Sequence, residues 1–275
     1  MKLKLLPAMI TTAGLLTAPF ALAATYQSEI SAAYADINVS ESSAEGYAVG
    51  LEGKYYFAPV DTANHPLAEA AFIQKANNVY LTLGNSEFKY AGDRVDYYQR
   101  SLGVDFYIPN TMFYLGAGIE EYKAKRTWPS DDYSDAGSYS TKWDSTWLVK
   151  AGIAPVTGLL VWSEFTEDVD VSDAWNINGK YVIPLSGEQA LNMEASYEKS
   201  YDIVDKITVA ADYYLDRNLS LGAGFVNSSY EGSRHNDNDY LIRARQFFTD
   251  NASLELGYWD GEYESKLMLE GTLRF

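Results

Sequence analysis

Apolar and polar residues alternate with a period of two along most of the chain. From Tyr47 to Phe57 the odd positions carry Tyr, Val, Leu, Gly, Tyr and Phe, whereas the even positions from 48 to 54 carry Ala, Gly, Glu and Lys. Successive side chains of a β-strand point to opposite faces, so this spacing predicts a strand with one apolar face. About ten such residues are enough to cross a bilayer as a tilted strand.

The same alternation recurs down the chain. It is clear in residues 101–108, 113–119, 143–153, 175–183, 191–198, 207–215, 219–225 and 240–248. Less regular strands are expected at about 25–38, 78–90, 158–168 and 253–263, and a final strand runs from Glu264 to Phe275. We expect fourteen strands in all. Twelve is the alternative, because the pairs around Thr25 and Leu159 have the weakest pattern.

The links between these strands alternate in length. Links 109–111, 155–158, 184–189, 216–218 and 249–252 are short, whereas 125–141, 167–174 and 231–238 are longer and polar. Short turns on the periplasmic side and longer loops outside are typical of bacterial outer-membrane barrels, which have an even number of strands.

The first residues predict a signal peptide. Lys2 and Lys4 precede the apolar stretch from Leu5 to Leu16, and Ala21-Leu22-Ala23 has the small-x-small form of a cleavage site. The stretch is shorter than the roughly 20 apolar residues of a spanning helix. We therefore expect residues 1–23 to be a signal peptide and residues 24–275 to form one domain.

The composition fits a membrane protein that crosses with strands. No later apolar run is long enough for a membrane-spanning helix, yet the chain carries 23 Tyr, 6 Trp and 11 Phe, residues enriched at membrane interfaces. In hydrocarbon every backbone polar group must be paired internally, so we predict an all-β, transmembrane, antiparallel up-and-down β-barrel in a bacterial outer membrane. With no cysteine, disulfides cannot close the fold.

The last strand separates this prediction from a soluble β-sandwich or propeller, which also alternates. One face carries Leu267, Leu269, Leu273 and Phe275, and the other carries Lys266, Glu270, Thr272 and Arg274. A soluble domain has no reason to end its chain on a buried aromatic strand. Following a signal peptide, this ending indicates a barrel.

One predicted periplasmic link is unusually long. Residues 58–76 include Leu67, Ala70, Ala71 and Ile73 at helical spacing, so a short helix is expected. Our interpretation is a structured turn packed against the barrel rim; a plug or a partner-binding element is the alternative.

The chain resembles the putative general bacterial porin family of γ-proteobacteria. The resemblance rests on the signal peptide, on YYFAPVDTANHPLAEAAFIQKANNVYLTLG from Tyr55 to Gly84, and on the terminal LMLEGTLRF. It implies diffusion of small hydrophilic solutes and no catalytic residues. The alternate residues Leu267, Leu269, Leu273 and Phe275 also resemble the signal read by the outer-membrane assembly machinery, although Gly271 interrupts the apolar alternation. Lipid and lipopolysaccharide are then the expected surroundings.

The alternation also predicts which side chains line the interior. The candidates are Glu52, Lys54, Asp105, Lys150, Glu164, Lys180, Glu194, Lys206, Asp212, Arg243, Arg245, Glu255, Glu270 and Arg274. Lys or Arg facing lipid at the midplane costs about 2–4 kcal/mol, so their placement on one face implies a wet interior. We favour a narrow water-filled channel. The alternative is an ion-pair network that fills the barrel and leaves a structural or adhesin-receptor role.

The formal net charge of −17 makes nucleic acid an unsuitable partner. Acidic residues gather in predicted external connections at Asp131, Asp132, Asp135, Asp237 and Asp239. Acidic mouths concentrate cations, which predicts a mild cation preference. Solvated loops account for the same residues without any function.

Catalysis is not predicted. A hydrolase needs a general base such as His beside a carboxylate or Ser, and the chain has two His. His65 lies in the link 58–76 and His235 in the polar stretch SRHNDND. No nucleotide-binding loop or metal-ligand spacing occurs, so neither a cofactor nor a metal is expected.

Overall fold

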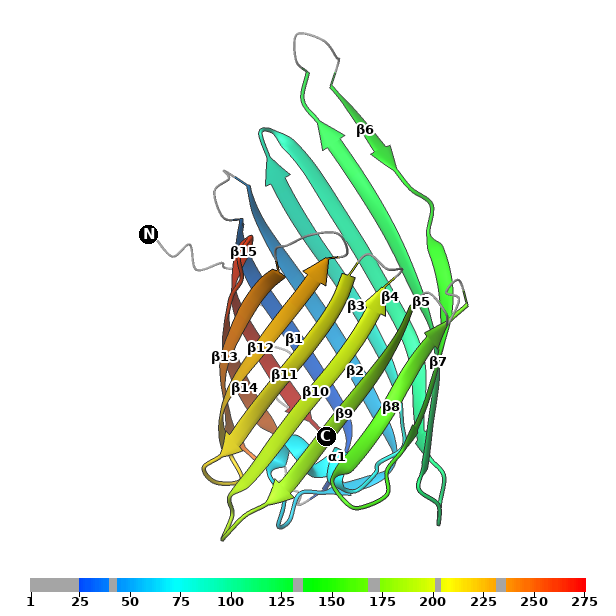
Figure 1. Cartoon of the computed structure of the whole chain (residues 1–275), viewed down its shortest axis with the longest axis vertical. Coiled ribbons are helices and arrows are strands. Elements are labelled where there is room, and N and C mark those ends of the chain that lie inside the picture. Colours follow the sequence, from blue (N-terminus) through cyan, green and yellow to red (C-terminus); the bar gives the residue numbers. More distant parts are fainter. Residues whose placement is uncertain (1–24, 40–43, 131–135, 168–173, 201–203, 231–235) are drawn as a thin grey trace.

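The computed structural model describes residues 25–39, 44–130, 136–167, 174–200, 204–230 and 236–275, and these form one closed barrel (Figure 1). The first strands are β1 (Thr25–Val39), β2 (Glu45–Asp61), β3 (Asn78–Tyr90), β4 (Asp93–Tyr107), β5 (Phe113–Trp128), β6 (Gly137–Ser140), β7 (Asp144–Ile153) and β8 (Leu159–Thr166). They are followed by β9 (Ala174–Pro184), β10 (Ala190–Ser200), β11 (Val204–Tyr214), β12 (Leu219–Tyr230), β13 (Asn236–Thr249), β14 (Ala252–Asp260) and β15 (Glu264–Arg274).

The barrel closes where its first and last strands pair. Ala32 of β1 lies opposite Gly271 of β15, and β4 pairs with β5, so the strands form a continuous antiparallel ring. Closure leaves no sheet edge inside the ring. The ring has fourteen strands, because β6 pairs only with the far end of β5 and lies outside it. The predicted barrel and its fourteen strands are therefore confirmed, and the twelve-strand alternative is wrong.

The outward face of the ring is apolar and exposed. Leu102 and Ile119 are each 56% exposed and Ile242 is 62% exposed. Isolated apolar residues are common on any protein surface, but a belt around the whole wall is the form that faces lipid. The terminal strand follows the same rule, with Leu267, Leu269 and Leu273 on the outward face. No helix in the described part of the chain is long and apolar enough to cross a membrane.

Two predicted loops are partly strands. The predicted link 125–141 contains the end of β5 and all of β6, and the predicted link 231–238 contains the start of β13 at Asn236. In Figure 1, β3 to β6 rise well beyond their neighbours at the end away from the short turns. Backbone ladders continue there after the apolar face has ended, so the alternation no longer reveals the strands.

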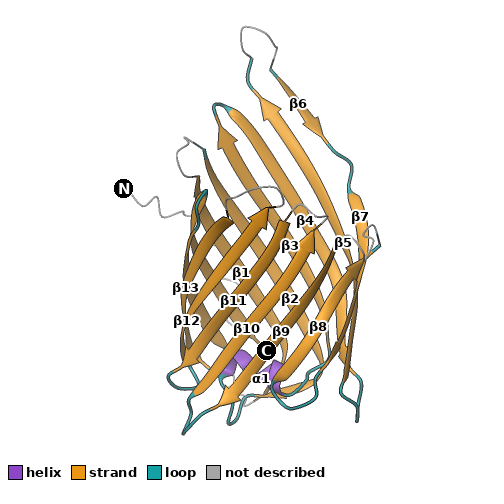
Figure 2. Ribbon diagram, in the orientation of Figure 1, coloured by secondary structure: helices purple, strands orange, loops and turns teal. Residues whose placement is uncertain are grey.

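Two short helices lie inside the barrel at the short-turn end. The 3₁₀ helix η3 (Leu67–Glu69) and α1 (Ala70–Ile73) connect β2 to β3, and Figures 1 and 2 show α1 within the ring of strands. Tyr26, Tyr56, Val60 and Ala70 form a buried cluster that joins this connection to the wall. The interpretation of residues 58–76 as a turn on the rim is therefore corrected. A partly apolar helix hides more of its apolar surface inside the ring than at the rim. Leu67 and Ala70 are accordingly fully buried.

Candidate functional site

The inward face of the barrel brings most of its charged side chains together. The strand register places all fourteen predicted interior residues on the face opposite the apolar belt. Seven of them are acidic and seven are basic. Most lie in clusters of opposite charge, three of which are described below.

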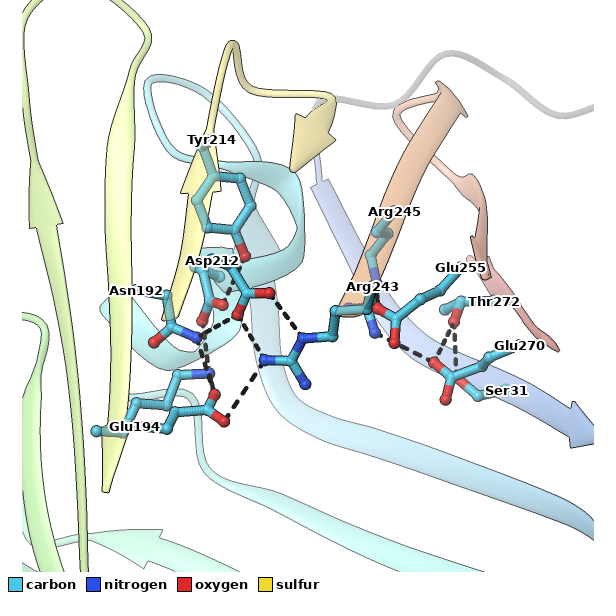
Figure 3. Close-up of polar contacts among 12 residues, drawn as sticks. Ser31, Asn192, Glu194, Asp212, Tyr214, Arg243, Arg245, Glu255, Glu270 and Thr272 are labelled. Carbon is cyan, nitrogen blue, oxygen red and sulfur yellow. Dashed lines mark hydrogen bonds and ion pairs between the residues drawn. The ribbon is translucent and has the colours of Figure 1, made fainter. Parts of the chain in front are cut away.

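The first cluster centres on a two-point ion pair across β11 to β13 (Figure 3). Arg243 donates through Nε and Nη2 to the two oxygens of Asp212 at 2.7 and 2.6 Å. Asn192 donates to Asp212 at 3.0 Å and to Glu194 at 2.8 Å. Lys180 lies 3.3 Å from Glu194. Planar two-point pairing fixes both partners in geometry as well as in charge, so the Arg243 and Asp212 side chains hold each other in place.

The second cluster lies beside it on β13 to β15 (Figure 3). Arg245 contacts Glu255 at 2.7 Å and Glu270 at 3.4 Å. Thr272 donates to Glu270 at 3.5 Å and shares a 2.9 Å hydrogen bond with Ser31 of β1. This cluster therefore crosses the junction at which the barrel closes.

The third cluster occupies the facing wall. Lys150 of β7 lies 3.4 Å from Asp105 of β4, which also accepts a 2.6 Å hydrogen bond from Tyr114. The Lys150 ammonium lies 5.1 Å from the centre of the Tyr80 ring. Cation, carboxylate and ring thus hold one another on this side.

The other predicted interior residues have simpler surroundings. Lys54 pairs with Glu52 on the same strand at 2.6 Å, and Glu164 accepts a 3.1 Å hydrogen bond from the Trp162 indole. Lys206 is exposed near the start of β11.

Arg274 links the wall to the connection that lies inside it. Its Nε donates to Glu29 at 2.6 Å and its Nη1 donates to the Leu67 carbonyl at 2.7 Å. The guanidinium also lies 4.5 Å from the Tyr26 ring centre and 4.8 Å from that of Phe247. Although Arg274 is a predicted interior residue, it is only 3% exposed and anchors residues 62–76. We call these residues the inner segment.

The inner segment is held by the turns as well as by the strands. The Leu67 amide donates to the Arg217 carbonyl at 2.9 Å, and the Arg217 guanidinium donates to the Thr62 carbonyl at 2.8 Å. On another side, Lys75 donates to the Ala154 carbonyl at 2.7 Å. These contacts reach the β11–β12 and β7–β8 turns.

Glu69 shows that the inner segment crosses the whole lumen. Its carboxylate accepts a 2.7 Å hydrogen bond from Tyr214 of β11 and lies 2.8 Å from the Lys180 ammonium of β9. In the ring of fourteen, the strand diametrically opposite β2 is β10, and β9 and β11 flank it. A chain that leaves the wall at β2 therefore contacts the far wall before it returns at β3.

Several residues of this site were not among the predicted ones. Glu29, Glu69, Asn192 and Tyr214 complete the contacts above. Glu29 lies on an irregular strand, and Asn192 and Tyr214 carry no charge, so the alternation gives these residues no distinguishing signal. Glu69 lies in the predicted helical link, where the spacing indicates a helix but not the direction in which it folds.

The predicted acidic mouth is partly described. Asp237 and Asp239 belong to β13 and face inward, so the expectation that they lie in a loop is wrong. Asp131, Asp132 and Asp135 fall outside the described residues, as do His235 and residues 1–23. His65 lies in the inner segment. Among the residues described, no group of three or more His, Cys, Asp or Glu side chains is placed to hold a metal ion.

Comparisons with known proteins agree with this architecture. No curated protein sequence matches the chain. The Acinetobacter baumannii outer membrane protein Omp33 superposes with a TM-score of 0.67 at 21% identity, over 92% of this chain and 99% of that chain. The CymD monoaromatic hydrocarbon channel gives 0.60 at 8% identity, over 91% and 89%, and a Pseudomonas aeruginosa FadL homologue gives 0.57 at 9%, over 91% and 90%.

At such identities these structures show a shared fold alone. The family match is of a different kind, because a sequence profile matches residues 1–157 and 153–266, which is nearly the entire chain. The resemblance noted in the sequence is thereby confirmed. The chain belongs to the putative general bacterial porin family.

Proposed function

We propose that the protein is a porin in the outer membrane of a Gram-negative bacterium, through which small hydrophilic solutes and ions diffuse passively. The observation that carries this proposal is the inward face, where charged side chains of both signs line a ring whose outer face is apolar. Rings of charge along an aqueous passage select solutes by size and sign. Membership of a porin family supports a transport role rather than an enzymatic one.

The inner segment makes this channel narrow at one end. Short turns mark the periplasmic end of such barrels, so the inner segment belongs to the periplasmic mouth. Solutes pass through the space beside the inner segment, or through the space that the inner segment leaves when it moves. The contacts of Glu69 with the far wall favour a resting state in which passage is restricted.

A mild cation preference follows from the opposite end of the lumen. There the inward face carries Glu120, Glu198, Asp237, Asp239 and Glu264, whereas Arg126, Lys206 and Lys266 are the inward basic residues among the described strands of that end. An acidic mouth raises the local concentration of cations.

The outward face fits the partners expected of such a protein. The apolar belt suits lipid and the lipid part of lipopolysaccharide. Leu267, Leu269, Leu273 and Phe275 on the terminal strand are the residues that we expect the assembly machinery to recognise.

Conductance of the refolded protein in a planar bilayer tests this function. We expect discrete ion-conducting steps, and swelling of liposomes in small sugars that declines as the solute grows. Barrels that refold but conduct no ions and admit no solutes would instead support a filled barrel with a structural or receptor role, which the inner segment also favours.

A further inference from the structure

The hydrogen-bonded ladder between β8 and β9 stops before either strand ends. Their paired register runs from Leu159 opposite Tyr181 to Trp162 opposite Asn178 and ends there. Both strands continue, β8 to Thr166 against β7 and β9 back to Ala174 against β10. By contrast, β10 and β11 are paired over their full lengths.

A side chain occupies the place of the missing ladder. The Asn176 amide donates to the Glu164 carbonyl at 3.1 Å, and its oxygen accepts from the Glu164 amide at 3.0 Å. Continuing the register would place these two residues opposite each other. The carboxamide of Asn176 therefore makes the pair of hydrogen bonds that its own backbone would otherwise make.

This arrangement satisfies the backbone without joining the strands directly. Unpaired backbone groups are strongly unfavourable in hydrocarbon, so two strands that part within a membrane need another partner. A carboxamide supplies it, and Asn178 steadies that carboxamide with a 2.8 Å hydrogen bond. Rotation of the Asn176 side chain alone would release the Glu164 backbone, whereas a full ladder separates only when many backbone hydrogen bonds break together. We call the part of the β8–β9 boundary beyond Trp162 the seam.

The outward side of the seam is apolar, whereas its inward side is polar. On the outward face, Phe165, Trp175 and Ile177 flank it and are between 37% and 45% exposed. On the inward face the seam carries Glu164 and Asn176. Below it, towards the short turns, Trp162 packs on a cluster formed by Tyr114, Ala154 and Leu160, together with Phe72 of the inner segment. Phe72 thus provides part of a floor beneath the lumen side of the seam.

We propose that the seam is a lateral portal, through which small solutes with an apolar body and one hydrogen-bonding end move between the lumen and the outer leaflet. The outward apolar side chains receive the body of the solute, and the Glu164 carboxylate on the inward face contacts its polar end. The inner segment restricts the axial route below this level, so the seam offers a second exit. This activity is separate from the axial diffusion proposed above.

A reversible lock on the seam tests the portal. The chain has no cysteine, so Ser163→Cys with Ile177→Cys places one possible disulfide across the seam on the outward face. Ala195→Cys with Val209→Cys places the matched disulfide across the fully paired β10–β11 boundary. The probe is N-phenyl-1-naphthylamine, an aromatic amine that fluoresces in membranes, added to intact Gram-negative cells that express each variant.

We expect the wild-type protein to accelerate probe uptake above that of cells without it. Oxidation of the seam pair abolishes this acceleration and a reductant restores it, whereas the β10–β11 pair has no effect. Asn176→Ala, which needs no cross-link, raises uptake severalfold. Migration of unheated samples on gels reports that each barrel is folded.

Three results overturn the portal: no acceleration by the wild-type protein, undiminished uptake through the locked seam, or unchanged uptake in Asn176→Ala. Bilayer conductance of the same variants keeps the two proposals apart. The locked seam is expected to conduct ions as the wild type does. If the wild-type protein accelerates probe uptake and the lock abolishes that acceleration, but no variant conducts ions, axial diffusion alone is contradicted.

Discussion

The Glu69 carboxylate lies 2.8 Å from the Lys180 ammonium, although the two residues belong to opposite sides of the barrel. Glu69 is 4% exposed. Removing one partner of a buried pair costs about 3–5 kcal/mol, because the other charge is left uncompensated. This contact is therefore a main restraint on the inner segment.

Glu69→Gln is expected to increase the open probability of the channel. The amide oxygen can still accept from Tyr214, so the variant removes chiefly the charge pair with Lys180. A loss of even about 1.4 kcal/mol shifts the equilibrium tenfold. Single-channel recording measures the open probability. Glu188→Gln, an exposed carboxylate in the β9–β10 turn, is the control, and identical traces from both variants would refute the restraint.

Leu67→Ala is expected to loosen the inner segment without unfolding the wall. Leu67 is fully buried, and such a truncation costs about 2–5 kcal/mol. Amide hydrogen exchange should accelerate within residues 62–76 and stay slow in the strands. Leu185→Ala, at an exposed turn position, should leave the amide exchange rates of the inner segment and of the strands unchanged. Uniformly faster exchange over the whole barrel would show that Leu67 supports the wall instead.

Arg274→Lys is expected to lower the temperature at which the barrel unfolds. Lysine cannot reproduce the planar donors that contact Glu29 and the Leu67 carbonyl together, and hydrogen bonds to charged groups contribute about 1.5–3 kcal/mol each. The heat-dependent shift in gel migration measures this temperature. Arg126→Lys is the control, since Arg126 pairs with Asp93 at an exposed position. Equal shifts in both variants would count against the anchoring role.

The charge preference of the channel is expected to depend on its acidic end. Glu198→Gln with Asp239→Asn removes two inward carboxylates and should move the reversal potential in a salt gradient away from cation preference. Asp36→Asn with Glu45→Gln removes two outward carboxylates at the same end and should have little effect. Equal shifts would mean that general surface charge, not the lumen, sets selectivity. Anion preference in the wild-type protein would contradict the proposal outright.

The period-two pattern predicted the wall well because its physical cause is local. Each strand must present apolar side chains to lipid, and a shift of one residue would invert both faces. Residues such as Arg243 and Glu255 could therefore be placed on the inward face from alternation alone. The pattern could not predict which charged residues would pair, since Asp212 and Arg243 lie on strands that are not adjacent.

The inner segment and the seam could not be predicted for different reasons. The spacing of Leu67, Ala70 and Ile73 predicts a helix, but its inward direction depends on distant partners such as Lys180 and Arg274. Asn176 fits the polar alternation of β9 like any inward residue. Only the structure shows that its side chain bonds the Glu164 backbone.

The most direct test of the account is the conductance of a barrel without its inner segment. The Phe57 amide donates to the Asn77 carbonyl at 2.9 Å, so an Asn-Gly turn can replace residues 58–76, which comprise the end of β2 and the inner segment, and close the β2–β3 hairpin. We predict that this folded variant stays open and conducts several times more current than the wild-type protein. A folded variant with unchanged conductance would contradict the claim that the inner segment restricts the channel.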